Sequence, residues 1–215
     1  MREQVLAAIR QHKLIAIVRG FEKDDVVWLA KTLYQGGFRM VEMTFDAARP
    51  ESWRANGEAI AAVREACPDM RVGAGTVLTP EQVEITHAAG GSYIVSPDVN
   101  VDVIRRTREL GMVSLPGAMT PTEMVTAHNA GADYVKLFPA GTLGPGYVKA
   151  VLAPLRHIKV LAVGGVTAEN LPAFLEAGAC GAGVGGSLVE KNAVARRDTD
   201  FILQQAQAFC RAAQG

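Results

Sequence analysis

Residues 14–18 read LIAIV, a short apolar run in which β-branched side chains dominate. Runs of this kind are typical of strands that are buried on both faces of a parallel sheet. Seven more follow at intervals along the chain: MVEMTF (40–45), RVGAG (71–75), SYIVS (92–96), MVSLP (112–116), DYVKLF (133–138), KVLAV (159–163) and GAGVG (181–185). Because glycine or proline bounds these runs, we predict eight buried strands.

The segments between the runs have the patterns of helices. Residues 24–34 carry apolar side chains three and four apart. Thr79-Pro80 and Thr120-Pro121 each place a capping threonine before a first-turn proline. Alternating strands and helices favour parallel pairing. The sequence therefore predicts an α/β fold, a small (β/α)₈ TIM barrel. A doubly wound sheet is the alternative, but eight strands are many for that fold at this length.

Length and charge limit the number of domains and the kinds of partner that we expect. The 215 residues fit one domain, residues 1–215, and residues 2–12 predict an extra amphipathic N-terminal helix that covers the barrel floor. Lys plus Arg and Asp plus Glu number 22 each, so no basic field would attract nucleic acid. Charges interrupt every apolar run before it could span a membrane, and no signal-peptide pattern begins the chain.

The cysteines indicate a reducing compartment. Cys67, Cys180 and Cys210 are odd in number and far apart, which is typical of reduced thiols rather than of a disulfide framework. We therefore expect a cytoplasmic protein.

Two of the predicted strands contain an ionisable residue. Glu42 lies within MVEMTF and Lys136 lies within DYVKLF. Side chains alternate between the two faces of a strand, and the apolar neighbours of both residues suit the helix layer, so Glu42 and Lys136 should point into the barrel. The second and sixth of eight strands lie opposite one another, and alternate strands share a layer of inward side chains. We therefore expect the two to meet near the catalytic end of the barrel.

This pair admits two interpretations. Glu42 and Lys136 could form a structural salt bridge, or Lys136 could extend to the barrel rim. We favour catalysis, because burial favours neutral lysine, which attacks ketones. Glu42 would then move protons while the Schiff base forms. Its negative charge opposes the effect of burial on lysine, so the sequence alone does not fix the pKa of Lys136.

Glycine-rich loops follow the last two strands. Gly164 and Gly165 begin one loop, and Gly186 and Ser187 lie in the other. In barrels this pair of loops forms phosphate sites from backbone N–H groups, and we predict one here; simple tight turns are the alternative. Arg19 and Thr76 end the first and third strands, where they could bind a substrate carboxylate or phosphate.

The sequence gives little support to a metal site. The four histidines (His12, His87, His128 and His157) lack the spacing of metal ligands, and we expect all of them at the surface. No acidic cluster has the pattern of a metal site either. We therefore predict no metal and no cofactor.

Several motifs occur together and in order: Arg19-Gly20, Glu42, GAGTVL (73–78), SPD (96–98), PGAMTPTE (116–123), KLFPA (136–140) and AVGGV (162–166). With these motifs the chain resembles the bacterial 2-keto-3-deoxy-6-phosphogluconate aldolase family. That family includes 4-hydroxy-2-oxoglutarate aldolases and a phosphogalactonate branch. The resemblance covers nearly the whole chain.

The resemblance implies a class I aldolase that cleaves a 2-keto-3-deoxy-6-phospho sugar acid to pyruvate and glyceraldehyde 3-phosphate. Lys136 would form the Schiff base and Glu42 would be the acid and base. The other residues that it implies at the site are Arg19, Thr76, Pro97, Phe138 and Val163 for the substrate, and Gly164, Gly165, Gly186 and Ser187 for the phosphate. It also implies a homotrimer.

The chain departs from the family pattern beside the glutamate. The phosphogluconate branch usually has an arginine four residues after it, for the pyruvate carboxylate, whereas this chain has Asp46. An acid cannot bind a carboxylate in that way, so Arg19, Thr76 or Arg49 must replace the arginine.

Other positions leave the substrate open. Val163 stands where the phosphogluconate branch tends to have threonine, and with Gly144-Pro145 and residues 147–150 it resembles the phosphogalactonate branch. Ser187 resembles the phosphogluconate branch instead. A 4-hydroxy-2-oxoglutarate aldolase, a phosphosugar isomerase or epimerase, and a non-enzymatic phosphosugar-binding barrel remain the alternatives.

Overall fold

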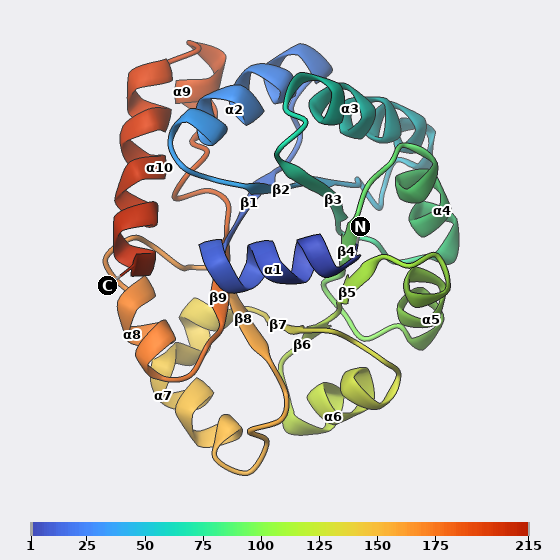
Figure 1. Ribbon diagram of the computed structural model, residues 1–215, viewed down its shortest axis with the longest axis vertical. Helices are drawn as coiled ribbons and strands as arrows, with labels where there is room; N and C mark the ends of the chain where they lie inside the picture. Colours follow the sequence, from blue (N-terminus) through green and yellow to red (C-terminus); the bar gives the residue numbers. More distant parts are fainter. Residues whose placement is uncertain (1, 215) are drawn as a thin grey trace.

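The computed structural model describes residues 2–214. Its strands form one sheet in which every pairing is parallel. They are β1 (Leu14–Val18), β2 (Met40–Thr44), β3 (Arg71–Gly75), β4 (Tyr93–Val95), β5 (Val113–Leu115), β6 (Gly117–Ala118), β7 (Val135–Leu137), β8 (Val160–Val163) and β9 (Gly181–Val184). The strand order is β5-β4-β3-β2-β1-β9-β8-β7-β6. The two end strands, β5 and β6, are consecutive in the chain, and the sheet curls into a nearly closed barrel (Figure 1).

Each predicted run contains a strand, and the run at residues 112–116 is continued by a short extra one. β5 pairs with β4, and β6 pairs with β7, so the two pieces together occupy one position in the ring. Pro116 separates them, because proline has no N–H to offer the ladder. Its carbonyl still accepts a hydrogen bond of 2.8 Å from the Lys136 N–H. The predicted (β/α)₈ barrel is confirmed, with its fifth strand broken in two.

The helices lie outside the ring, except for α1 (Figure 1). They are α1 (Arg2–His12), α2 (Lys23–Gln35), α3 (Trp53–Ala66), α4 (Pro80–Ala88), α5 (Val101–Glu109), α6 (Pro121–Asn129), α7 (Ala140–Leu152), α8 (Leu171–Glu176), α9 (Lys191–Ala195) and α10 (Thr199–Gln214), with a 3₁₀ turn at Pro50–Ser52. Thr79 and Thr120 form capping boxes at the starts of α4 and α6, as predicted. Within residues 2–214, no helix combines the length and apolar character needed to cross a membrane.

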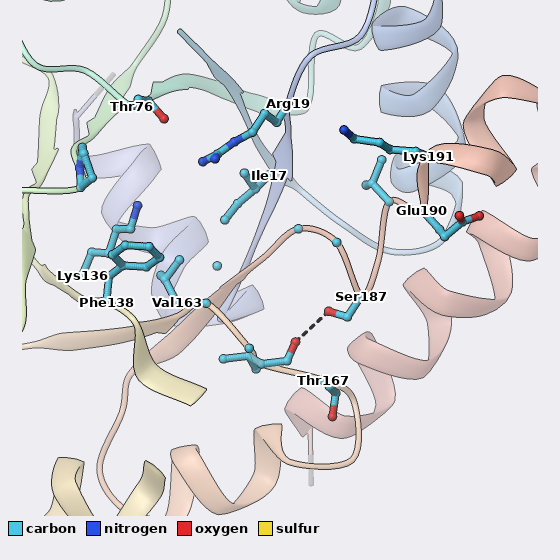
Figure 2. A pocket seen from close by; sticks show the side chains of 18 of the residues that line it. Ile17, Arg19, Thr76, Lys136, Phe138, Val163, Thr167, Ser187, Glu190 and Lys191 are labelled. Atoms are coloured by element: carbon cyan, nitrogen blue, oxygen red, sulfur yellow. Dashed lines mark hydrogen bonds between the residues drawn. The ribbon is translucent and has the colours of Figure 1, made fainter. Parts of the chain in front are cut away.

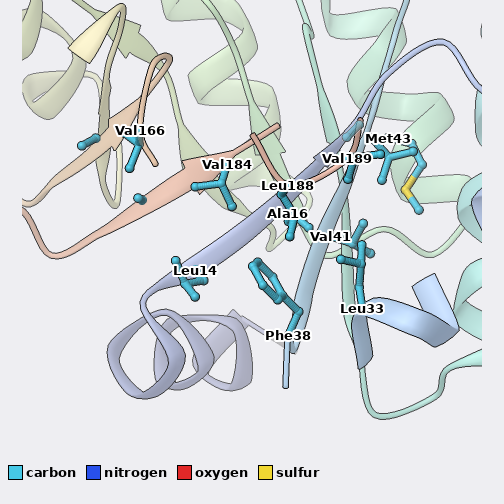
Figure 3. Packing of buried hydrophobic residues seen from close by; sticks show 14 of the residues in the cluster. Leu14, Ala16, Leu33, Phe38, Val41, Met43, Val166, Val184, Leu188 and Val189 are labelled. Carbon is cyan, nitrogen blue, oxygen red and sulfur yellow. The ribbon is translucent and has the colours of Figure 1, made fainter. Parts of the chain in front are cut away.

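Alternation along the strands divides the apolar side chains into two layers. Outward residues such as Ala16 and Val41 pack against helix residues such as Leu33 (Figure 3). Inward residues of the strands and apolar residues of α1 form a second cluster, which we call the floor: Val5, Leu6, Ala8, Ile9, Ile15, Met40, Tyr93, Val95, Val113, Leu115, Tyr134 and Leu161. The opposite end of the barrel, where the strands finish, is the mouth.

The predicted N-terminal helix is confirmed as the cover of the floor. Val5 and Ile9 of α1 are at most 1% exposed and belong to the floor cluster. Arg2 forms an ion pair with the buried carboxylate of Asp133, which also accepts a hydrogen bond of 3.0 Å from the Ser114 N–H. With this end closed, a ligand reaches the barrel interior from the mouth.

Candidate active site

A cavity of about 930 Å³ opens at the mouth of the barrel. Almost all of the predicted site residues line it: Arg19, Thr76, Pro97, Lys136, Phe138, Val163, Gly164, Gly165, Gly186 and Ser187. Figure 2 shows Lys136, Phe138 and Val163 on one side of it, with Arg19 and Thr76 opposite. These residues come from loops and strands around the whole ring, so the closed barrel is what brings them together.

Glu42 lies deeper, beneath this cavity. It lines a small internal cavity of about 10 Å³, and Lys136 and Val163 line the same space. The carboxylate side chain is 2% exposed and the lysine is 5% exposed. A volume of this size holds about one water molecule. Lys136 therefore lies between the open cavity above and the buried glutamate below.

The register of the strands gives Lys136 and Glu42 their inward orientation. Lys136 pairs with Leu161 of β8, and its neighbours Val135 and Leu137 belong to the outer core. Three strand positions separate β2 from β7 on either side of the ring, counting β5 and β6 as one. The predicted opposition across the barrel is therefore confirmed.

Lys136 and Glu42 do not form the salt bridge that was the alternative interpretation. Within residues 2–214, no ion pair of 4.0 Å or less joins them, and the Lys136 Nζ makes no hydrogen bond. The Nζ lies 5.0 Å from the centroid of the Phe138 ring. The amine is thus buried and unbonded, and is available to react.

Burial moves the pKa values of both groups toward neutrality. Loss of hydration lowers the pKa of Lys136, with help from the positive charge of Arg19, although Glu42 opposes the effect. Burial raises the pKa of Glu42 from 4.5 to about 7, against the attraction of Lys136 and Arg19. Near neutral pH, Lys136 has more of its nucleophilic neutral form, and Glu42 can both accept and donate a proton.

Glycines on the inner faces of the strands give these side chains room. A Cβ on Gly75 would collide with the Oε1 of Glu42, and one on Gly183 would lie 2.9 Å from the Cγ2 of Val163. Neither glycine was predicted from the sequence to have a role at the site. The signal was present, because a glycine weakens a strand unless another group must approach closely.

The first glycine loop, residues 164–167, has a backbone conformation that depends on glycine. Gly164 and Gly165 have φ values of 88° and 75°, which side-chain-bearing residues rarely adopt. The Gly164 carbonyl accepts a hydrogen bond of 2.7 Å from the Gly141 N–H at the start of α7. This contact fixes the loop against the helix and leaves its other edge facing the cavity.

The second glycine loop, residues 185–187, joins the first. The Ser187 hydroxyl donates a hydrogen bond of 2.7 Å to the Val166 carbonyl (Figure 2). In the part of the chain that the structure describes, the N–H groups of Gly165, Gly186 and Ser187 make no hydrogen bond. Two adjoining loops therefore offer free N–H donors at the rim of the cavity, as an anion site requires.

Thr76 and Arg19 form the opposite rim. Thr76 has a φ of 55°, and this left-handed backbone is unusual for a β-branched residue. Strained residues of this kind concentrate at functional sites. Arg19 is exposed, lines the cavity and takes part in no ion pair within the described residues. Both side chains are available to a ligand carboxylate.

Arg49 lies outside the main cavity, although Arg19 and Thr76 border the adjoining cavity that it lines. It donates a hydrogen bond of 2.7 Å to Asp46 and lines an adjoining cavity of about 650 Å³ with it. This bond lowers the pKa of Asp46, so the carboxylate stays ionised. Of the three residues considered as substitutes for the missing arginine, only Arg19 and Thr76 line the main cavity.

The cavity also contains residues that the sequence analysis missed. Ile17 of β1 faces inward, and Phe21 follows Arg19 in the loop. Lys191 begins α9, four residues after Ser187, and Figure 2 shows it on the same side of the cavity as Arg19. Its position four residues after Ser187 was the one feature of the sequence that could have indicated a role for Lys191, because a single lysine on a short helix usually has none.

The histidines and cysteines were predicted to take no part in the site, and the histidines were expected at the surface. His87, His128 and His157 are exposed, but His12 is half-buried, because α1 lies against the barrel. Cys67, Cys180 and Cys210 are free thiols. Within residues 2–214, no group of three or more His, Cys, Asp or Glu side chains is arranged to hold a metal ion.

Known proteins resemble this chain along most of its length. A protein-family model described as KDPG and KHG aldolase matches residues 5–205. The 2-dehydro-3-deoxy-6-phosphogalactonate aldolase of Escherichia coli is 40% identical over 201 residues, covering 93% of each chain. The 2-dehydro-3-deoxy-phosphogluconate aldolase of Treponema pallidum is 35% identical over 172 residues, covering 80% of this chain and 79% of that protein. A solved structure described as native KDPGal has a TM-score of 0.85 at 38% identity, over 95% of each chain.

Proposed function

Because the chain belongs to the KDPG and KHG aldolase family, we propose that it cleaves a 2-keto-3-deoxy-6-phospho sugar acid through a Schiff base on Lys136. The products are pyruvate and glyceraldehyde 3-phosphate. One observation carries the assignment of Lys136: a buried amine, with a lowered pKa and no ion-pair partner among the described residues, lies at the base of the cavity and borders the same small space as Glu42.

The reaction begins with the neutral amine of Lys136. It attacks the C2 ketone, and the carbonyl oxygen gains a proton to give a carbinolamine. Loss of water, assisted by proton donation from Glu42, then leaves an iminium ion. Glu42 suits this step because its pKa of about 7 leaves part of the population protonated at neutral pH.

Cleavage reverses the direction of proton transfer. The ionised carboxylate of Glu42 removes the proton of the C4 hydroxyl, and the C3–C4 bond breaks to release the aldehyde. The bonding electrons move into the enamine, which the iminium nitrogen stabilises. Protonation at C3 and addition of water then release pyruvate and restore the free amine of Lys136.

Binding groups at the two rims orient the substrate. Arg19 and Thr76 hold the carboxylate of the keto acid, in place of the arginine that Asp46 cannot supply. The free N–H groups of Gly165, Gly186 and Ser187 bind the phosphate, and Gly164, whose missing side chain makes room for the Phe138 ring, gives the first loop its left-handed turn. Lys191, which follows the second glycine loop and lines the same cavity, adds a positive charge that attracts a dianion, which the neutral loops alone do not balance. Pro97 and Phe138 complete the cavity wall beside the reacting carbon.

We infer that the phosphogalactonate acid is the preferred substrate. The two sugar acids are epimers at C4, the carbon whose hydroxyl reacts. Val163 is 5% exposed and lines both the main cavity and the small cavity below it, so a methyl group stands where a threonine would present a hydroxyl. The similarity to the E. coli phosphogalactonate aldolase supports this choice.

Other reactions fit the site less well. A 4-hydroxy-2-oxoglutarate substrate has no phosphate and would leave the loop N–H donors without a partner. A phosphosugar isomerase or epimerase would have no use for the buried Lys136.

Reductive trapping tests the Schiff base. Incubation with pyruvate and borohydride should add one reduced pyruvyl group, and peptide mass spectrometry should locate it on Lys136. Lys136→Ala should remove the adduct, whereas Lys149→Ala, an exposed control outside the cavity, should keep it. No adduct, or an adduct on another lysine, would overturn the proposal.

A substrate comparison tests the preference. Pyruvate release should be faster, in kcat/KM, from the phosphogalactonate acid than from the phosphogluconate or 4-hydroxy-2-oxoglutarate compounds. Val163→Thr should shift the ratio between the two epimers by about tenfold, the effect of one hydrogen bond in a buried site. An unchanged ratio would remove Val163 as the determinant.

We further propose that residues 1–215 act as one domain, in a homotrimer located in the cytoplasm. The exposed apolar side chain of Met119, which lies outside the cavity, supports association, and the free thiols support a reducing compartment. Sedimentation equilibrium should give three times the mass of 22.8 kDa. A monomer at micromolar concentration would contradict the trimer.

A further inference from the structure

A buried hydroxyl below the site lacks a partner. Tyr93 is 0% exposed, and its OH makes no hydrogen bond with any described residue. Leaving a buried hydroxyl unbonded costs about 1–3 kcal/mol, so natural proteins rarely retain one without use. The floor cluster around it is otherwise apolar, apart from the hydroxyl of Tyr134 and the partly buried thiol of Cys180.

The geometry of β3 directs the Tyr93 ring toward Glu42. Glu42 pairs in register with Gly73, and β4, which carries Tyr93, lies on the other side of β3. A Cβ on Gly73 would lie 2.6 Å from the Cδ2 and Cε2 atoms of the Tyr93 ring. The missing side chain therefore lets the ring extend across β3 toward β2.

The side chain of Glu42 also lies over Gly75, the next inward position of β3 after Gly73. Its Oε1 occupies the place of a side chain on Gly75. Successive inward positions on a strand are about 7 Å apart, so the ring over Gly73 and the carboxylate over Gly75 are neighbours in consecutive layers. The negative charge of Glu42 also contributes to the raised pKa of the Tyr93 phenol, after the larger effect of burial.

We propose that Tyr93 is a positioning residue whose hydroxyl donates a hydrogen bond to ionised Glu42 through one bridging water molecule. The bond holds the carboxylate beneath Lys136 and stabilises the form that acts as a base. This role deepens the proposed Schiff-base function and rests on it.

The other groups around Glu42 do not supply this bond. The charged groups that face it are Lys136 from β7 and Arg19 from the loop after β1. The remaining walls of the small cavity carry no titratable group: Ile15, Ile17, Val95, Leu115, Leu161, Val163 and Gly183. Among the described residues neither cation is hydrogen-bonded to the carboxylate. The buried hydroxyls without a partner near it are those of Tyr93, on the side of the floor, and Thr44, two residues further along β2 toward the mouth.

Proton exchange of pyruvate isolates the role of Glu42. In heavy water, the pyruvyl iminium on Lys136 loses a C3 proton to the Glu42 carboxylate, and its electrons form the enamine. Deuterium returns to C3 and water releases labelled pyruvate, which NMR detects. At saturating pyruvate the lysine is already bonded, so the rise of the exchange rate with pH reports the ionisation of Glu42.

Tyr93→Phe removes only the hydroxyl. Its loss should raise the midpoint of this pH profile by about one unit, because the ionised carboxylate loses a donor. The exchange rate should fall about tenfold below the midpoint and stay unchanged well above it. A ring-fluorinated tyrosine at position 93, which is a stronger donor, should shift the midpoint the other way.

Tyr134→Phe is the matched control. Tyr134 belongs to the same floor cluster and is 2% exposed, but Arg10, Asp133 and Cys180 surround it rather than Glu42. Its removal should leave the profile in place. An unmoved midpoint in Tyr93→Phe, or an equal shift in both variants, would overturn the role of Tyr93. If the wild-type protein exchanges no protons and traps no pyruvate, the Schiff-base function itself fails.

Discussion

The floor and the mouth of the barrel use the same inward strand positions for opposite purposes. At the floor these positions carry side chains such as Ile15, Met40 and Val113, which α1 covers. At the mouth they carry Glu42, Lys136 and glycines, and the end is open. The comparison indicates that burial of one end provides the stability that lets the other keep costly charges and strained backbone.

The largest effect should come from replacing the reactive group at the mouth. Lys136→Met keeps an unbranched side chain of similar length but removes the amine, so we expect kcat for aldol cleavage to fall about 10³-fold or more. The melting temperature should stay the same or rise, because a buried ionisable group is replaced by an apolar one. Steady-state kinetics and calorimetry measure the two effects. A variant with wild-type kcat would contradict the catalytic role.

Truncating a side chain at the floor should lower the stability of the protein and leave its activity almost unchanged. Ile9 is 1% exposed against the barrel interior, so Ile9→Ala should lower the free energy of unfolding by about 2–4 kcal/mol. The kcat of the folded fraction should change little, since Ile9 lies at the end remote from the cavity. Gln11→Ala, at an exposed position of the same helix, is the control and should change stability by less than about 0.5 kcal/mol. Equal loss in both variants would show that α1 does not close a packed floor.

The charge of Glu42 should appear in the pH dependence of stability. Its pKa is raised from 4.5 to about 7 on folding, so the folded chain binds this proton more tightly than the unfolded chain. The stability from this group is present below pH 4.5 and is lost as the pH rises through about 7. Glu42→Gln stays neutral, so it should be more stable than the wild type by about 1–3 kcal/mol at pH 8.

Denaturant titration of both proteins across this range measures the difference. It should shrink toward acid pH, where the wild-type carboxyl is protonated as well. A stability difference that does not change with pH would mean that burial does not raise the pKa of Glu42.

The smallest effect should come from the rim. Lys191 is exposed, so its attraction for a phosphate dianion is partly screened by solvent. We expect Lys191→Ala to raise KM for the phosphorylated substrate about three- to tenfold, with little change in kcat. Proton exchange of pyruvate, which has no phosphate, should be unaffected, and Lys149→Ala serves as the control. Loss of both activities together would place Lys191 in the chemistry rather than in phosphate binding.

Much of this arrangement could be predicted from local patterns. The apolar runs, LIAIV and MVEMTF among them, predicted the strands, and Thr79 and Thr120 predicted two helix starts. The inward orientation of Glu42 and Lys136 followed from alternation, because side-chain direction in a strand depends only on parity. The break at Pro116, which divides one strand into β5 and β6, was also marked by the proline itself, although its consequence was not predicted.

The contacts between distant segments could not be predicted in this way. Arg19, Arg49 and Thr76 were equal candidates for the substrate carboxylate until the fold bonded Arg49 to Asp46 outside the cavity. Lys191 and Tyr93 gave no pattern that separates them from ordinary surface and core residues. Each acquires its setting from other strands or loops, and sequence spacing carries no information about those distances.

Local patterns in the chain were enough to predict the barrel, the glycine loops and the two ionisable residues that face its interior. Three features emerge from the folded structure instead: among the described residues Lys136 and Glu42 are not bonded to each other, their pKa values move toward neutrality, and an unbonded phenol lies below them. The reason is physical. Hydrophobic periodicity is a local property of the chain, whereas desolvation and electrostatic interaction depend on the distances that the folded barrel imposes.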